Sequence, residues 1–289
     1  MKPASFEYVD PRSIDEAVEQ LARHGEEAKV LAGGQSLMPM LNLRLARPAV
    51  IVDVNRVPAL DRITEENGTL RVGALVRQRA LERWSVARVP VLAAGLRLVG
   101  HTAIRNRGTV AGSVVHADPA AELPALLLCL DGSAVARSRA GEREIAAEAL
   151  FQGPLMTTLR PDELVVETRW APPPPGTGWS VQEVARRHGD FALVGVVALI
   201  TRIHGVIQRA RIGLFGTGPV SVRAAAAERI LVGQTPTPAL VEQAAQAAGE
   251  NLEPLSDLHA PAAYRARVAR TLTGRALGEA LTRAGDDAR

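Results

Sequence analysis

The fold is decided by the stretch Lys29-Val30-Leu31-Ala32-Gly33-Gly34-Gln35-Ser36-Leu37, in which a short apolar strand runs into two glycines. Residues 37–45 then have the pattern of a helix, with Ser36 as its N-cap and Pro39 in its first turn. A second apolar strand follows at 50–54. The order of these patterns predicts a compact strand, helix, strand unit.

The Gly-Gly turn of this unit has the chemistry of an anion site. Gly33 and Gly34 allow positive φ and let the backbone approach a phosphate oxygen without a Cβ in the way. Free N–H groups at a helix start, with the helix dipole behind them, favour a pyrophosphate. Taken alone, however, the loop is better explained as an ordinary strand-to-helix turn.

A second glycine-bearing segment lies at 102–113 and has the sequence Thr-Ala-Ile-Arg-Asn-Arg-Gly-Thr-Val-Ala-Gly-Ser. Neither segment contains the P-loop pattern G-x-x-x-x-G-K-[ST] or a complete G-x-G-x-x-G, so the two commonest phosphate-binding schemes do not apply. Thr109 and Ser113 can donate to phosphate or flavin carbonyls, and Gly112 permits close approach. We therefore expect both segments to bind the pyrophosphate of one dinucleotide.

Two carboxylates follow this segment at Asp118 and Glu122. A carboxylate in this place can accept hydrogen bonds from ribose or ribitol hydroxyls. The alternative is that both side chains cap the helix predicted through Leu128, and Asp118, just before Pro119, suits that role well.

Several motifs, spread over most of the chain in one order, resemble a known family. They are Phe6-Glu7-Tyr8, the Ala-Gly-Gly-Gln-Ser-Leu loop at 32–37, Ile104-Arg105-Asn106-Arg107-Gly108-Thr109 with Gly112-Ser113, Ala117-Asp118-Pro119 with Glu122-Leu123-Pro124, and Arg186-Arg187-His188-Gly189-Asp190-Phe191-Ala192. The chain is similar to the FAD-binding medium subunit of molybdenum hydroxylases of the carbon monoxide dehydrogenase and xanthine dehydrogenase type. One departure is Ala111, where the family most often has glycine, and we expect the segment to tolerate it if φ stays negative.

The resemblance implies an α+β fold with two domains. Residues 1–172 would form a two-part FAD-binding domain of the vanillyl-alcohol-oxidase (PCMH) type, with sub-lobes at about 1–56 and 57–172. Residues 177–289 would form a carbon monoxide dehydrogenase flavoprotein-like C-terminal domain, a smaller lobe of three-stranded antiparallel sheet plus helices.

The sequence pattern agrees with this layout. Asn67-Gly68 predicts a hairpin turn within 61–73, and the prolines of 172–176 predict a stiff, extended lobe boundary. His204-Gly205 predicts a turn between two antiparallel strands. The expected strands are 133–135, 163–169, 179–184, 191–203 and 206–215, and the expected helices are 78–84, 91–98, 223–232, 238–249 and 262–283.

We expect the chain to bind FAD noncovalently. Phe191 lies where the family places residues near the isoalloxazine, so its ring could stack there; the alternative is that Phe191 begins a buried strand with Leu193 and Val194. We assign no catalytic acid, base or nucleophile, because the cofactor carries the chemistry. The expected cofactor-binding residues are Lys29, Leu31, Ala32, Gly33, Gly34, Gln35, Ser36, Leu37, Ile104, Gly108, Thr109, Ala111, Gly112, Ser113, Asp118, Glu122 and Phe191.

The chain has a single cysteine, Cys129, in an apolar run typical of a core. An iron–sulfur cluster normally takes four cysteine ligands, and the six histidines show no metal-binding spacing, so we expect no metal site in this chain. If the protein is a redox protein, its electrons must pass through an organic cofactor here and through other centres in partner chains.

Composition excludes several other classes of protein. A length of 289 residues predicts two or three lobes, and a net charge of +3 without a basic block argues against a nucleic-acid partner. The N-terminus lacks the apolar region of a signal peptide, and the longest uncharged apolar run, 191–200, is too short to span a bilayer. We therefore expect a cytoplasmic protein without a transmembrane segment.

The resemblance also implies partner chains. A large subunit carrying molybdenum and pterin would oxidise the substrate, and a small subunit with two [2Fe–2S] clusters would pass electrons to this FAD, in a dimer of heterotrimers (a heterohexamer). FAD would then reduce an external acceptor such as a quinone, NAD or oxygen. Two alternatives are a stand-alone FAD-dependent oxidase or reductase of the same fold and a nonenzymatic nucleotide-binding protein.

Overall fold

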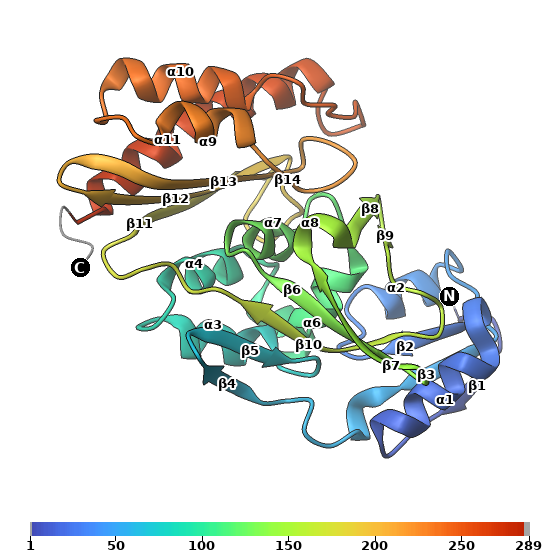
Figure 1. The fold of residues 1–289 in the computed structure, drawn as a ribbon. Coiled ribbons are helices and arrows are strands. Elements are labelled where there is room, and N and C mark those ends of the chain that lie inside the picture. Colours follow the sequence, from blue (N-terminus) through green and yellow to red (C-terminus); the bar gives the residue numbers. More distant parts are fainter. Residues whose placement is uncertain (1, 286–289) are drawn as a thin grey trace.

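The computed structural model describes residues 2–285. Its N-terminal part is a three-stranded parallel sheet in the order β1-β3-β2, with helix α1 packed on it (Figure 1). The Ser13 side chain caps α1 by accepting from Glu16 N at 3.1 Å, and the helix buries Ala17, Val18 and Leu21. The elements are β1 (Glu7–Val9), α1 (Ile14–His24), the 3₁₀ turns η1 (Gly25–Glu27) and η2 (Val54–Arg56), β2 (Ala28–Leu31) and β3 (Val50–Asp53).

The predicted strand, helix, strand unit is confirmed as β2, α2 (Leu37–Asn42) and β3. Ser36 lies at the expected N-cap position, but its backbone angles are helical and its side chain makes no capping hydrogen bond. Gly34, with φ +72°, turns the chain into the helix, and its carbonyl accepts from Met38 N at 3.0 Å. The backbone turn at Gly34 thus satisfies an N–H group at the helix start, as the Ser36 side chain was expected to do.

An antiparallel five-stranded sheet follows, in the order β4-β5-β10-β6-β7. The predicted hairpin is confirmed, with Asn67 at φ 51° and Gly68 at φ 76° in its turn. The strands are β4 (Ile63–Glu66), β5 (Thr69–Gly73), β6 (Ser133–Ser138), β7 (Gly141–Ala146) and β10 (Leu164–Trp170), and a small hairpin is made by β8 (Phe151–Gly153) and β9 (Met156–Thr157).

Helices lie between this sheet and the C-terminal part of the chain (Figure 1). Every residue of α7 is buried, because it packs in the main core and also contacts strands of the C-terminal sheet. A helix covered on all sides is apolar all round, which is the pattern seen at 123–130. The helices are α3 (Gln78–Ser85), α4 (Pro90–Leu98), α5 (Thr102–Arg107), α6 (Val110–His116), α7 (Glu122–Cys129) and the short α8 (Ala147–Leu150).

The C-terminal part is an antiparallel sheet with helices on its outer face (Figure 1). It contains the three predicted strands and a fourth of two residues, and the turn between the long strands has His204 at φ 50° and Gly205 at φ 78°. The elements are β11 (Gly178–Val184), β12 (Val194–Ile203), β13 (Val206–Phe215), β14 (Val222–Arg223), α9 (Ala225–Leu231), α10 (Pro238–Ala248) and α11 (Ala262–Arg283).

The proline-rich segment between β10 and β11 is not extended throughout. Thr177 N donates to Pro174 O at 3.1 Å, and Gly176 has φ +79°, so the segment ends in a turn. Among residues 2–285, no helix has the length and apolarity needed to cross a membrane.

Candidate functional site

The two glycine-bearing segments meet at Gly33. A Cβ at this position would lie 2.6 Å from Arg107 O, 2.7 Å from Gly108 Cα and 2.9 Å from Thr109 N. Gly33 itself is not in the left-handed region, whereas Gly34 is. Gly33 is therefore needed for close approach between two backbone segments, and the expected positive φ applies to Gly34 alone.

The second segment is more helical than its sequence predicts. Helices α5 and α6 occupy it, leaving only Gly108 and Thr109 between them. Thr109 is the N-cap of α6, and its Oγ1 accepts from Gly112 N at 3.1 Å. A Cβ on Gly112 would lie 2.5 Å from that oxygen, so the glycine leaves room for the cap. Ala111 is helical without positive φ, as expected for a tolerated alanine.

Free backbone donors gather where the segments meet. In the described part of the chain, the N–H groups of residues 33–37 have no hydrogen-bond acceptor, and the same holds for those of Thr109 and Ala111. Backbone amides without a partner favour an anionic ligand. These amides come from both segments, which is the arrangement that a shared pyrophosphate needs.

Arg77 and Asn55 hold the two segments together. The Arg77 guanidinium donates to Arg107 O at 2.8 Å and to Asn55 Oδ1 at 2.7 Å, and Asn55 Nδ2 donates to Ala32 O at 2.8 Å. Sequence reasoning missed both residues. Asn55 follows the carboxyl end of β3, the edge of a parallel sheet where ligands commonly bind, and that position could have identified it. No comparable signal marks Arg77.

Arg77 and Arg107 bring positive charge to this junction, and the carboxylates of Asp53 and Asp61 are near enough to act on Arg77. Burial lowers the pKa of Arg77, and the nearby Arg107 lowers it further, yet guanidinium groups remain protonated in proteins. Within residues 2–285, neither arginine forms an ion pair, and neither does Lys29, which is exposed on β2. Cations without carboxylate partners fit a doubly charged pyrophosphate.

The capping role considered for Asp118 and Glu122 does not describe their contacts. Asp118 Oδ1 accepts from Ala120 N at 2.9 Å, and the N-cap of α7 is Ala121, so Asp118 does not cap the helix. Glu122, which begins α7, is only 7 % exposed. Burial raises the pKa of Glu122 to about 8, and the negative charges of Glu183 and Asp118 contribute. The carboxyl group can therefore be protonated near neutral pH.

Phe191 lies outside the buried strand. It is 72 % exposed and precedes β12 by three residues, so the alternative that it belongs to the core is wrong. The segment before it packs against the start of α5, because a Cβ on Gly189 would overlap the His101 ring. The His101 and His188 ring centroids are 6.1 Å apart. Phe191 thus follows a segment that contacts the start of α5.

Two further features of this region have structural roles. Arg186 and Arg187 are paired charges, at 3.3 Å and 3.0 Å from Asp190 oxygens. The Gly216-Thr217-Gly218 sequence is a structural link, because Gly216 N donates to Pro119 O at 2.7 Å.

The remaining predicted residues surround the junction. Leu31 ends β2 and its Cδ1 would contact a Cβ on Gly34 at 3.2 Å. Gln35 folds back, with Nε2 donating to Gly33 O at 2.9 Å. Ile104 is partly exposed on α5, Gly108 is packed against the Gln78 side chain, and Ser113 is half-buried on α6.

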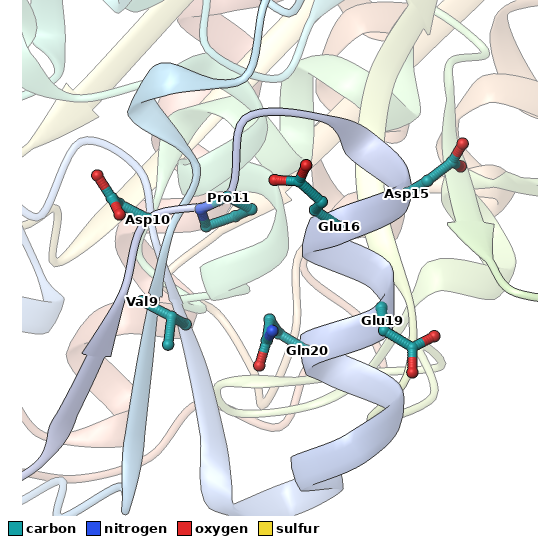
Figure 2. A pocket seen from close by; sticks show the side chains of 7 residues that line it. All are labelled: Val9, Asp10, Pro11, Asp15, Glu16, Glu19 and Gln20. Carbon is teal, nitrogen blue, oxygen red and sulfur yellow. The ribbon is translucent and has the colours of Figure 1, made fainter.

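A depression between the end of β1 and α1 lies apart from these residues. Figure 2 shows its acidic lining, which includes Asp10, Asp15 and Glu19. Asp10 lies 3.1 Å from Arg12 and from Arg56, Asp15 lies 3.3 Å from Arg137, and Glu19 lies 3.3 Å from Arg139, while the fourth carboxylate, Glu16, accepts from the backbone N–H of Arg12 at 2.7 Å. None of the predicted site residues lines this depression.

Cys129 is a core thiol, as predicted. It is fully buried, and burial raises the pKa of its thiol, which makes it unreactive. The described residues contain no cluster of three or more histidine, cysteine, aspartate or glutamate side chains able to hold a metal ion.

Comparisons with known proteins assign both parts of the chain to known families. Residues 4–169 match the family described as "FAD binding domain in molybdopterin dehydrogenase", and residues 179–280 match "CO dehydrogenase flavoprotein C-terminal domain". The chain is 42 % identical to the 6-hydroxypseudooxynicotine dehydrogenase complex subunit alpha of Paenarthrobacter nicotinovorans, covering 98 % of this chain and 97 % of that one. It is 36 % identical to the carbon monoxide dehydrogenase medium chain of Hydrogenophaga pseudoflava, over 98 % of this chain and 99 % of that one.

Solved structures show the same fold. Carbon monoxide dehydrogenase from Hydrogenophaga pseudoflava matches with a TM-score of 0.96 at 38 % identity, over 99 % of this chain and 100 % of that chain. Quinoline 2-oxidoreductase from Pseudomonas putida 86 matches with a TM-score of 0.92 at 36 % identity, over 98 % of this chain and 99 % of that chain. The chain therefore belongs to the family of FAD-binding medium subunits of molybdenum hydroxylases.

Proposed function

We propose that this chain binds FAD with its pyrophosphate at the junction of the two glycine-bearing segments, and that it is the electron-exit subunit of a molybdenum hydroxylase. The observation that carries the proposal is the contact of Gly33 with the backbone of residues 107–109, which brings unpaired amides from both segments together. Arg77 and Arg107 supply positive charge at the same place.

Each group of residues has a separate task in this proposal. The amides of residues 33–37 and of Thr109 hold the pyrophosphate, and the Thr109 hydroxyl, which already accepts from Gly112 N, still has a proton to donate. Asp118 and Glu122 bind ribose or ribitol hydroxyls, and Phe191 covers the ring system. FAD, when bound, supplies the electron-transfer chemistry, and the chain positions it.

Partner chains follow from the same proposal. We propose a large molybdenum–pterin subunit and a small subunit with two [2Fe–2S] clusters, assembled as a dimer of heterotrimers. The lone, buried Cys129 supports this, because an iron–sulfur cluster needs more cysteines than the chain has. Relatives carry names such as "medium chain" and "subunit alpha". A cytoplasmic location remains a prediction that cell fractionation would test.

The domain boundary is also part of the proposal. We place it in the proline-rich segment at 172–176, between the five-stranded sheet and the C-terminal sheet. The two family matches leave the same segment between them, since one ends at 169 and the other begins at 179.

The test is the cofactor content and composition of the native protein. We expect a yellow preparation with one FAD per chain, which co-elutes with iron and molybdenum in size-exclusion chromatography. A colourless chain that takes up no FAD would overturn the proposal and favour a nonenzymatic nucleotide-binding protein. A yellow protein that elutes alone, without iron, would favour a stand-alone oxidase or reductase.

A further inference from the structure

Arg265 links three segments that are far apart in the sequence. It lies on α11 and is only 7 % exposed. Its Nη1 donates to the carbonyls of Leu193 and of Gly216, the second at 3.4 Å, and its Nη2 donates to Asp257 Oδ2 at 2.7 Å. A buried guanidinium with carbonyl and carboxylate acceptors is well placed to fix backbone positions, because its planar fork has donors in set directions.

Asp257 keeps this guanidinium in place. Asp257 Oδ1 accepts from His259 N at 2.8 Å and from Ala260 N at 2.9 Å, while the other oxygen binds Arg265. Hydrogen bonds from the two backbone amides, with a contribution from Arg265, lower the pKa of Asp257 to about 2. The carboxylate is therefore charged throughout the physiological range and balances the buried cation.

The Leu193 carbonyl belongs to the segment that carries Phe191. Leu193 N donates to Val184 O at 2.7 Å, so Leu193 is held on its amide side by β11 and on its carbonyl side by Arg265. Phe191 is two residues away and exposed. Anchoring Leu193 therefore restrains the backbone that leads to Phe191.

The Gly216 carbonyl belongs to a segment that contacts the residue after Asp118. Gly216 has φ +70°, and a Cβ there would lie 2.6 Å from Leu193 O, so the two carbonyl-bearing residues are packed together. Gly216 N donates to Pro119 O at 2.7 Å, and Pro119 directly follows Asp118. One guanidinium thus anchors both the Phe191 segment and the segment that bears Asp118 and Glu122.

We propose that Arg265 is a positioning residue for the flavin: by binding the Leu193 and Gly216 carbonyls it sets where Phe191 and the Asp118–Glu122 segment lie relative to the ring system. This rests on the proposed function, in which FAD lies against those two segments. Arg265 acts through them and does not itself contact the cofactor in this proposal.

The test compares Arg265→Met and Arg265→Lys in the full chain loaded with FAD. Arg275→Met is the matched control, because Arg275 is exposed on the same helix. The readouts are FAD content, the visible circular dichroism of the bound flavin, and the rate at which dithionite-reduced protein reduces a dye acceptor. Visible circular dichroism reports the asymmetry of the ring's surroundings, which a change in overall stability alone would not alter.

We expect Arg265→Met to keep FAD, to change the flavin circular dichroism, and to lower the dye-reduction rate roughly tenfold, since small displacements at a reacting centre have effects of this size or larger. Lysine keeps the charge, so Arg265→Lys should recover part of both signals. Asp257→Asn is a second variant, and it keeps Arg265. It should change the flavin circular dichroism and the dye-reduction rate in the same direction as Arg265→Met, but by a smaller amount. Arg275→Met should match the wild type.

A double variant tests the route of the effect. If Arg265 acts through the Phe191 segment, Phe191→Leu combined with Arg265→Met loses less than the product of the two single losses. Losses that multiply would overturn that route, and an unchanged spectrum and rate in Arg265→Met with FAD bound would overturn the positioning role altogether. Failure of the wild-type chain to bind FAD would instead refute the proposed function.

Discussion

Gly33 leaves no room for a side chain, because its neighbours are backbone atoms that cannot move aside as a flexible side chain would. Gly33→Ala should separate the two segments and weaken FAD binding by about 2 kcal/mol, roughly thirtyfold in Kd. Titration of the apo chain with FAD, followed by fluorescence quenching, measures this. Gly278→Ala is the control, because a Cβ there meets nothing within 4 Å. Equal Kd values for the two variants would contradict the account.

Sequence reasoning identified Gly33 but not the reason for it. A single sequence shows that Gly33-Gly34 can turn, and the structure gives that role to Gly34. Glycine is required at position 33 because the backbone of residues 107–109 leaves no space for a Cβ. This contact is between residues that are far apart in the sequence. Arg77 was missed for the same physical reason, since its role consists of hydrogen bonds between segments, whereas the position of Asn55 after β3 could have identified it.

Glu122 makes the stability of the FAD-free chain depend on pH. Its pKa is raised by burial to about 8 in the folded state, above the ordinary value of 4.5. The contribution of this carboxyl group to the free energy of unfolding is therefore fully present below about pH 4.5 and is lost as the pH rises through 8. The loss is at most about 5 kcal/mol. Glu183, whose pKa burial raises to about 7, adds a loss of the same sign.

The corresponding variant is Glu122→Gln. We expect its thermal unfolding temperature to fall less than that of the wild type between pH 6 and pH 9, because an amide has no charge to bury. Glu242→Gln, at an exposed position on α10, should behave like the wild type. The account fails here if Glu122→Gln and the wild type lose the same stability over this range.

At the scale of elements, the cap of α6 joins local structure to the site. Thr109→Val removes the acceptor for Gly112 N and should destabilise the chain by about 1 kcal/mol. It should also weaken FAD binding, because the hydroxyl and the helix start lie at the junction. Thr237 caps α10 in the same way, accepting from Leu240 N at 3.1 Å, so Thr237→Val should cost similar stability without affecting FAD. Denaturant unfolding and FAD titration of both variants separate the two effects.

Thr109→Ser keeps both the acceptor and the hydroxyl, so it should restore FAD binding. If Thr109→Val and Thr237→Val changed the FAD affinity equally, the site would not include the start of α6.

Elements with a clear apolar pattern or a marked turn were predictable from the sequence, whereas the short helices of the second glycine-bearing segment were not. The strands β12 and β13 and the helix α11 are close to their predicted bounds, because each has a clear apolar pattern and a marked end. Gly108, Thr109 and Gly112 favour turns, yet the segment that contains them forms the helices α5 and α6. Tertiary contacts override this preference: Val110 N donates to Val76 O at 3.0 Å, and Gln78 N donates to Gly108 O at 2.9 Å.

At the scale of the whole molecule, electron transfer needs chains beyond this one. The single cysteine predicts that the purified chain contains no iron when it is expressed alone. Co-expression with the proposed partner chains, a molybdenum–pterin subunit and a small subunit with two [2Fe–2S] clusters, should give a complex that contains iron, molybdenum and FAD. Metal analysis of the chromatographic peak measures this. Iron bound in the chain expressed alone would contradict the prediction.

The central claim is that backbone amides from two separated segments bind the same pyrophosphate. A crystal structure of the chain with FAD tests it most directly. We predict the pyrophosphate oxygens within hydrogen-bonding distance of amides in residues 33–37 and of Thr109 N, beside Gly33. A pyrophosphate held by only one segment, or FAD bound elsewhere on the chain, would contradict the account.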